Sequence, residues 1–221
     1  MGTTIDLKSA DGHSFSAYTA GDTGARRGVV VIQEIFGVNH HIREMVDRFA
    51  AHGYAAIAPA LFDRAQRGAE LGYTQDDIGA GRELRMKLKD SAVMADVEAA
   101  ANHLAGKKLG IVGYCFGGTV AWWGATRTSK FAAASCWYGG GIPGTKNERP
   151  NCPVQMHFGE KDASIPMSDV DAVRAAQPGV EVYVYNGAQH GFGCDERASY
   201  SKADYDLAQQ RTLDFFAKHL G

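Results

Sequence analysis

Residues 113–118 read Gly-Tyr-Cys-Phe-Gly-Gly, and this stretch decides the fold. The apolar segment that leads into it, 108–114, predicts a buried strand, and the segment 119–125 predicts a helix. A reactive side chain between two glycines, at the turn from a strand into a helix, is typical of a nucleophile elbow. The turn is strained, so the positions two before and two after the nucleophile need small residues. Cys115 is therefore the candidate nucleophile.

A cysteine at this turn is well placed for catalysis, but two other interpretations of it are open. The N-terminus of a helix carries partial positive charge and N–H groups, which favour a thiolate and a developing oxyanion. The same pattern also fits an inert cysteine buried in a tight turn. A third interpretation is a binding or redox-sensing protein with an exposed thiol, although that role requires no acid or histidine later in the chain.

The rest of the chain alternates between strand and helix patterns. Segment 28–33 (GVVVIQ) is a β-branched run typical of a strand buried on both faces. We expect further strands at 4–7, 14–18, 54–58, 132–138, 154–158 and 181–185, and further helices at 40–52, 76–90, 91–105, 168–177 and 200–219. This alternation predicts an α/β fold with a mostly parallel central sheet and helices on both faces, in one domain over 1–221. Residues 60–90 include a polar, irregular stretch and are a candidate insertion near the active site.

Two later segments supply an acid and a base in the order that an elbow of this kind requires. Asp162 follows the strand at 154–158, where an acid is expected, although a turn or helix-cap aspartate is the structural alternative and Glu160 a substitute. His190 lies in a glycine-flanked loop after the strand at 181–185, which suits a general base. His157 falls inside a predicted strand and is expected in the core. We therefore predict a Cys-His-Asp hydrolytic triad.

Size and charge narrow the class of protein. A chain of 221 residues, 45% of them hydrophobic, can bury a full apolar core. The net charge of −2 lacks the clustered basic excess of a nucleic-acid-binding protein. No stretch approaches the ~20 apolar residues of a membrane span, and we see no signal peptide. The four cysteines lack zinc-site spacing. We expect a cytoplasmic monomer or homodimer that needs no metal or cofactor and acts on a small molecule.

A fourth segment, residues 33–37 (Gln-Glu-Ile-Phe-Gly), follows the first core strand. Together with GYCFGG, FGEKD and AQHGF, it makes the chain resemble the dienelactone hydrolase family, the small cysteine members of the α/β-hydrolases, from about residue 28 to 218. The resemblance implies an α/β-hydrolase fold. It implies that Glu34 interacts with the Cys115 thiol and helps to deprotonate it when substrate binds. It also implies an oxyanion hole formed by the backbone N–H groups of Ile35 and Phe116.

The resemblance also implies the reaction. Sulfur attacks an activated acyl carbon without the strong base that a serine hydroxyl needs. We therefore expect hydrolysis of a small carboxylic ester or lactone, of the dienelactone (carboxymethylenebutenolide) type, through a thioacyl-enzyme. The alternative is a broad-specificity carboxylesterase or thioesterase with a different natural substrate.

Substrate binding is where the chain departs from the family pattern. Members that act on dienelactones hold the substrate carboxylate with arginines, one of them shortly after the catalytic histidine. Cys194 stands at that place here, and Arg197 is the nearby substitute. Arg82 or Arg85 is the candidate second clamp, and a surface ion pair is the alternative for each arginine. The family pattern also implies that Tyr138 lines the pocket. Phe36 is either a further pocket wall or a core residue.

Overall fold

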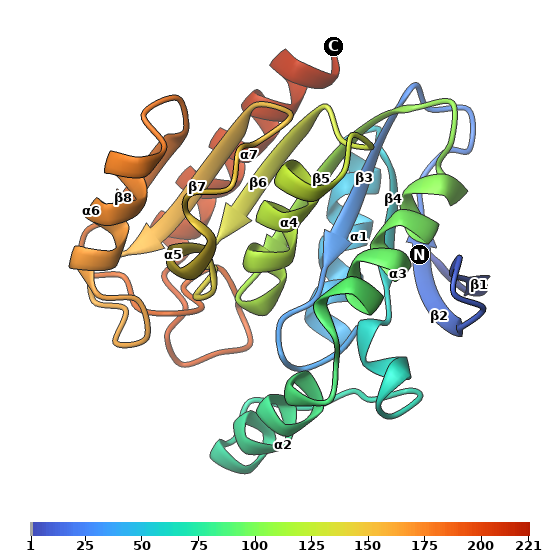
Figure 1. The fold of residues 1–221 in the computed structure, drawn as a ribbon, viewed down its shortest axis with the longest axis horizontal. Helices are drawn as coiled ribbons and strands as arrows, with labels where there is room; N and C mark the ends of the chain where they lie inside the picture. The colour runs from blue at the N-terminus through green and yellow to red at the C-terminus, as the bar shows by residue number, and fades with distance from the viewer. Residues whose placement is uncertain (1) are drawn as a thin grey trace. The chain divides into compact units, whose positions relative to one another are not determined.

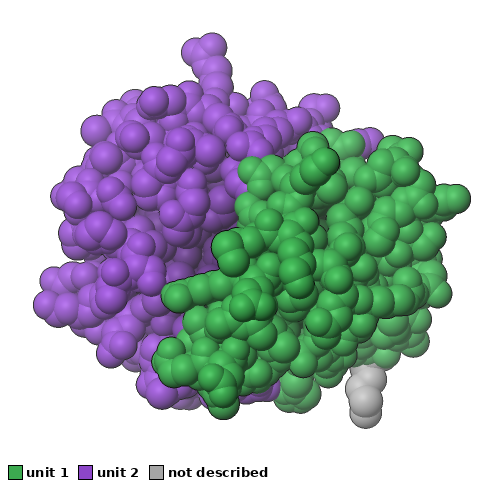
Figure 2. Space-filling view, turned by 60° about the horizontal axis from the view of Figure 1, so that its bottom comes forward, with its two compact units in different colours: residues 1–110 green, residues 111–221 purple. Residues whose placement is uncertain are grey.

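The computed structural model describes residues 2–221, which form two compact units, one ending at Gly110 and one beginning at Ile111 (Figure 2). In each unit, strands alternate with helices that pack on them, so the predicted α/β class is confirmed. The organisation as a single domain stays a prediction. No helix among the described residues is both long enough and apolar enough to cross a membrane.

The first unit begins with a hairpin of β1 (Thr3–Lys8) and β2 (Ser14–Ala20). β2 runs antiparallel to β4 (Ala55–Pro59), and β3 (Arg27–Ile32) pairs with β4 in parallel. The strand order in this unit is β1-β2-β4-β3, and all five residues of β4 are buried. The helical elements are α1 (His40–Ala51), the 3-10 helix η1 (Leu61–Arg64), α2 (Gln75–Met86) and α3 (Asp90–His103).

The helices of the first unit cover both faces of its strands. In Figure 1, α1 lies behind β3 and β4, α3 lies in front of them, and α2 projects beyond the strand ends. Local sequence signals explain the helix starts. The Asn39 side chain accepts the N–H of Ile42 at the start of α1. Thr74 and Asp77 form a reciprocal capping box at the start of α2.

The second unit has the strand order β5-β6-β7-β8. β5 (Lys108–Tyr114) begins at the end of the first unit, and β6 (Ala133–Trp137), β7 (Val154–Gly159) and β8 (Glu181–Tyr185) follow with parallel pairing. Its helices are α4 (Phe116–Arg127), the short α5 (Ile142–Thr145), α6 (Met167–Ala176) and α7 (Lys202–Leu220). In Figure 1, α4 lies in front of β6 and α7 behind it.

Two helix ends lie more than two residues from their predicted positions, and two short helices were not predicted. The helix expected at 76–90 ends at Met86, because residues 87–89 form a turn before α3 starts. No glycine or proline marks that break. The helix expected at 119–125 begins at Phe116. The predicted start was too late because Gly117 and Gly118 weaken the helical signal in the sequence. The polar stretch after residue 60, expected to be irregular, contains the 3-10 helix η1, and the segment after β6 contains the short helix α5.

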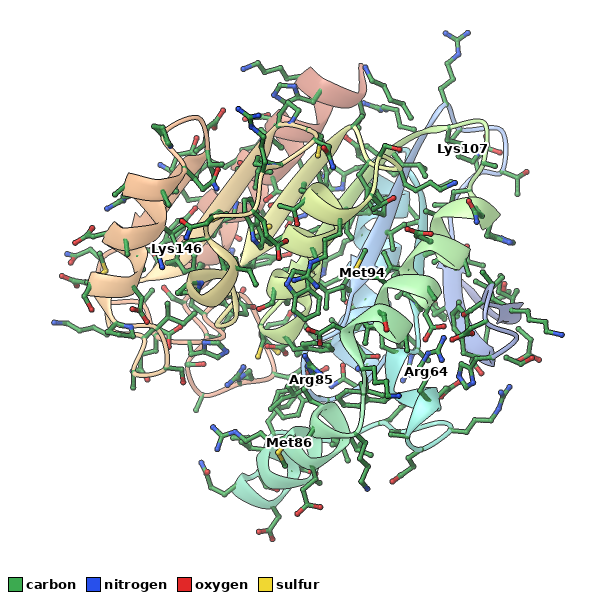
Figure 3. The ribbon with its side chains drawn as sticks, in the orientation of Figure 1. Arg64, Arg85, Met86, Met94, Lys107 and Lys146 are labelled. Atoms are coloured by element: carbon green, nitrogen blue, oxygen red, sulfur yellow. The ribbon has the colours of Figure 1, made fainter. Side chains whose placement is uncertain are left out.

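A buried ion pair ties the hairpin tip of the first unit to its helices. The Asp96 side chain on α3 is fully buried, and Arg64 donates to both of its oxygens at 2.7 and 2.8 Å. The Ser9 hydroxyl also bonds to Asp96, and Arg64 reaches Asp11 in the hairpin turn at 2.8 Å. Figure 3 labels Arg64, which reaches from η1 toward α3. A buried carboxylate is tolerated here because a bidentate guanidinium compensates it.

Replacing Arg64 by methionine is expected to lower the free energy of unfolding by about 3–5 kcal/mol, because it strands the buried carboxylate of Asp96. Urea denaturation measures this loss. Arg67→Met is the matched control, since the Arg67–Asp6 pair is more than half exposed on both sides. The control should cost less than about 1 kcal/mol. Equal losses in the two variants would contradict the role assigned to Arg64.

Candidate active site

The elbow places Cys115 at the junction of β5 and α4. Its backbone has φ 56° and ψ −117°, a strained conformation for a residue other than glycine. The Cys115 N–H donates to the Trp137 carbonyl at 3.0 Å. A Cβ atom on Gly113 would lie 1.9 Å from the Gly117 carbonyl oxygen, so the turn cannot close with a larger residue at 113. The crowding inferred from the sequence is thus present in the structure.

Asp162 and His190 meet in the same unit as Cys115. Asp162 follows β7 and is almost fully buried, and its Oδ1 accepts the N–H groups of Ser164 and Ile165 at 2.8 and 3.2 Å. Its Oδ2 lies 2.7 Å from Nδ1 of His190, in the loop after β8. The Asp162 carboxylate is therefore fixed by the backbone N–H groups that follow it, and it binds one nitrogen of the imidazole.

The charge state of His190 depends on its two neighbours. Burial by itself disfavours the imidazolium, but the negative charge of Cys115 and hydrogen bonds to Asp162 and Cys115 outweigh it. Together they raise the pKa of His190 to about 10. The structure thus brings the sulfur, the imidazole and the carboxylate together, with His190 as the central group.

The N-terminus of α4 provides the surroundings of the sulfur. Phe116 is its first residue, and the N–H groups of Gly118 and Thr119 bond to the Cys115 carbonyl at 3.0 and 3.4 Å. The N–H groups of the first helical residues precede the internal hydrogen-bond ladder and can point at an anion. This geometry is compatible with the predicted oxyanion role of the Phe116 N–H, which stays a prediction.

Glu34, Ile35 and Phe36 belong to the first unit and follow β3. Glu34 and Phe36 are both 1% exposed, and the Phe36 ring packs edge-on against Tyr73, with centroids 4.7 Å apart. A Cβ atom on Gly81 would lie 2.1 Å from the Ile35 carbonyl, so α2 rests directly on this turn. The catalytic role of Glu34, the oxyanion role of Ile35 and the pocket role of Phe36 stay predictions.

The candidate arginines have different surroundings. Arg85, labelled in Figure 3 on α2, pairs with Asp90 at 2.6 Å and donates to the Leu88 carbonyl, which favours the ion-pair alternative for it. Arg82 is exposed on α2. Arg197 lies against the residue after the base: a Cβ atom on Gly191 would be 2.3 Å from its Nη1. Arg197 thus packs on the loop that carries His190.

An aromatic cluster anchors the loop of His190. The cluster comprises Trp137, Tyr138, Tyr185 and Phe192, all at least 97% buried. Phe192, two residues after the base, contacts the other three rings at 4.9–5.7 Å between centroids. The sequence prediction missed Phe192; its only signal was its place directly after the glycine that follows the histidine. Cys194, at the position of the family arginine, is fully buried.

The comparisons with known proteins match nearly the whole chain. The model of the “Dienelactone hydrolase family” matches residues 15–220. A relative from Synechocystis named “Putative carboxymethylenebutenolidase” is 37% identical over 212 residues, covering 87% of this chain and 86% of the relative. An identically named relative from Salmonella typhimurium is 34% identical and covers 99% of this chain and 87% of its own length.

The solved structures agree with this match. The crystal structure of a “Putative Dienelactone Hydrolase” from Klebsiella pneumoniae superposes with a TM-score of 0.81 at 33% identity, covering 98% of this chain and 99% of the other. An esterase from Pyrococcus furiosus shares the fold at 15% identity, with a TM-score of 0.74 over 100% of this chain and 94% of its own. The predicted α/β-hydrolase fold is confirmed, and the chain belongs to the dienelactone hydrolase family.

Proposed function

We propose that this protein hydrolyses small carboxylic esters or lactones with Cys115 as the nucleophile. The observation that carries the proposal is the contact of His190 with Asp162 at 2.7 Å on one side and with Cys115 on the other, beside a strained elbow. The names of the relatives give the reaction class, since a carboxymethylenebutenolidase opens a lactone ester. A nucleophile, a base and an orienting acid at hydrogen-bonding distance are what acyl transfer requires.

The proposed reaction has two half-reactions. In the first, the Cys115 thiolate attacks the acyl carbon, the C–O bond to the leaving group breaks, and His190 protonates the departing oxygen. The product is a thioacyl-enzyme with a neutral imidazole. In the second, that imidazole takes a proton from water, the resulting hydroxide attacks the thioester, and the C–S bond breaks. The products are the thiolate–imidazolium pair and the carboxylic acid, which releases its proton to solvent and leaves as the carboxylate.

Asp162 contributes by orientation. Two backbone N–H groups bind its carboxylate, so the carboxylate is already fixed in position before the substrate binds. A fixed anion at Nδ1 directs Nε2 toward the sulfur and stabilises the imidazolium that donates to the leaving group. Within this proposal, the N–H groups of Ile35 and Phe116 bind the oxyanion, and Glu34 helps to deprotonate the thiol when substrate binds.

Arg197 is the candidate for recognition of a substrate carboxylate. Its guanidinium packs on Gly191, the residue directly after His190, so it lies in the loop that carries the base. Tyr138, which contacts the His190 ring, is the candidate pocket wall. These two residues favour an anionic, planar substrate such as an unsaturated lactone acid.

The broad-specificity carboxylesterase or thioesterase remains a second candidate, and the burial of Cys194 favours it. A fully buried thiol at the position of the family arginine offers a substrate no positive charge. If Arg197 does not bind the substrate, neutral and anionic esters should react equally well.

Cys115→Ala is expected to abolish hydrolysis of p-nitrophenyl acetate while the circular dichroism spectrum and melting temperature stay near the wild-type values. The loss follows because the variant has no sulfur to acylate. Cys152→Ala is the matched control, since Cys152 is a partly exposed thiol in a loop before β7. It should retain full activity. Wild-type turnover by folded Cys115→Ala would refute the assignment of the nucleophile.

Cys115→Ala is also expected to lower the pKa of His190 from about 10 toward or below its ordinary value of 6.5, because it removes the negative charge while burial remains. Nitrogen-detected NMR of the imidazole measures this pKa. His157 is the internal control: it is fully buried, its pKa is lowered to about 3, and it should stay neutral in both proteins. An unchanged pKa of His190 would contradict the proposed ion pair.

Arg197→Gln is expected to reduce kcat/KM for an anionic lactone or ester about 10- to 100-fold, the value of one charge-assisted hydrogen bond. It should leave kcat/KM for a neutral aryl ester within about twofold. Arg82→Gln, an exposed arginine on α2, is the comparison variant. Equal effects of Arg197→Gln on the two substrates would favour the broad-specificity alternative.

A further inference from the structure

Tyr138 has an unusual backbone. Among the described residues, only Cys115 and Tyr138 combine a side chain with a positive φ, which is 38° for Tyr138. A bulky aromatic residue is disfavoured there, and such strain persists only where the surroundings impose it. The Tyr138 N–H donates to the His157 carbonyl at 2.8 Å, and the preceding carbonyl, of Trp137, accepts the Cys115 N–H. The strained residue is therefore tied to β7 and to the elbow.

The backbone conformation determines where the ring goes. Successive side chains of a regular strand point to opposite faces of the sheet. Trp137 and Tyr138 are consecutive, yet both rings contact Phe192, with centroids 5.7 and 5.4 Å apart. The turn at Tyr138 thus brings its ring to the side of the base loop. There it meets the His190 imidazole edge-on, at 5.2 Å between centroids and 63° between planes.

The segment that carries Tyr138 is closely packed on two sides. A Cβ atom on Gly118 would lie 2.3 Å from the Trp137 carbonyl, and one on Gly139 would lie 2.7 Å from the Thr119 nitrogen. On the other side, a Cβ atom on Gly193 would lie 2.8 Å from the Trp137 ring. The segment 137–139 is therefore packed against the nucleophile elbow and against the base loop at the same time.

The hydrogen bonds of His190 to Asp162 and Cys115 leave one motion of the ring unconstrained. They fix two points of the imidazole, but the ring can still rotate about the line that joins these points. A contact away from that line opposes the rotation, and the Tyr138 ring supplies one.

We propose that Tyr138 is a positioning residue: its strained backbone presses its ring against His190 and thereby keeps Nε2 of the imidazole aimed at the Cys115 sulfur. The proposal rests on the proposed function and deepens it. It goes beyond the role of a pocket wall, because the tyrosine acts on the base and needs no contact with the substrate.

The test uses the pH dependence of Cys115 alkylation by iodoacetamide, which reports the thiolate–imidazolium pair and requires no ester. Tyr138→Gly removes the ring and suits the positive φ. It is expected to lower the alkylation rate at pH 7 at least tenfold and to move the profile to higher pH, toward that of an unpaired thiol. Tyr138→Phe keeps the ring and should have the wild-type alkylation profile.

The matched control is Tyr185→Leu. Tyr185 is a buried member of the same aromatic cluster, and its ring contacts Phe192. This variant should lose stability in urea and keep the wild-type alkylation profile. If Tyr138→Gly does not fold, Tyr138→Asn, whose short side chain tolerates positive φ, is measured against the same criteria.

A folded Tyr138→Gly or Tyr138→Asn protein with the wild-type alkylation profile would overturn the proposal. So would a Tyr185→Leu profile shifted as far as that of the Tyr138 variant, because the effect would then be general loosening of the cluster. Both results leave the proposed function standing if the wild-type protein hydrolyses esters. Absence of any esterase activity in the wild-type protein would instead refute the proposed function.

Discussion

A buried imidazolium is stable only where negative charge compensates it, and the position of His190 between Asp162 and Cys115 meets this condition. The carboxylate lies 2.7 Å from one ring nitrogen, and the sulfur forms the second interaction. Without these neighbours, burial would favour the neutral ring. In the proposed function, the same imidazole therefore serves both the nucleophile and the leaving group.

The rest of the second unit holds these three side chains in place. The elbow strains the Cys115 backbone and crowds Gly113 against Gly117, so that the sulfur sits at the start of α4. Two N–H groups after β7 fix the Asp162 carboxylate. The loop of the base has no regular secondary structure, and Phe192 anchors it in the aromatic cluster. Strain and rigidity are concentrated where the chemistry needs fixed geometry.

Much of this was predictable from the sequence, for identifiable reasons. Hydrophobic patterning located the strands, including 108–114 and 181–185 with the observed bounds, because it is the main signal of strand formation in a sequence. The glycines of 113–118 indicated the elbow through their steric role. The acid and the histidine followed from their places after successive strands, since parallel strands end at one edge of a sheet.

Other features depend on tertiary contacts that no local pattern encodes. The positive φ of Tyr138 occurs where its N–H donates to the His157 carbonyl and the neighbouring Trp137 carbonyl accepts the Cys115 N–H, and both partners are distant in sequence. The packing of Arg197 on Gly191 was not predictable, because the sequence showed only that Arg197 follows His190 by a few residues.

The most direct measurement of the central claim is mass spectrometry of the protein quenched during turnover of a slowly hydrolysed ester. The account predicts an added acyl mass on the peptide that contains Cys115, which disappears when the reaction is left to finish. Acylation of a different residue, or rapid ester hydrolysis with no acyl group on Cys115 at any time, would contradict it.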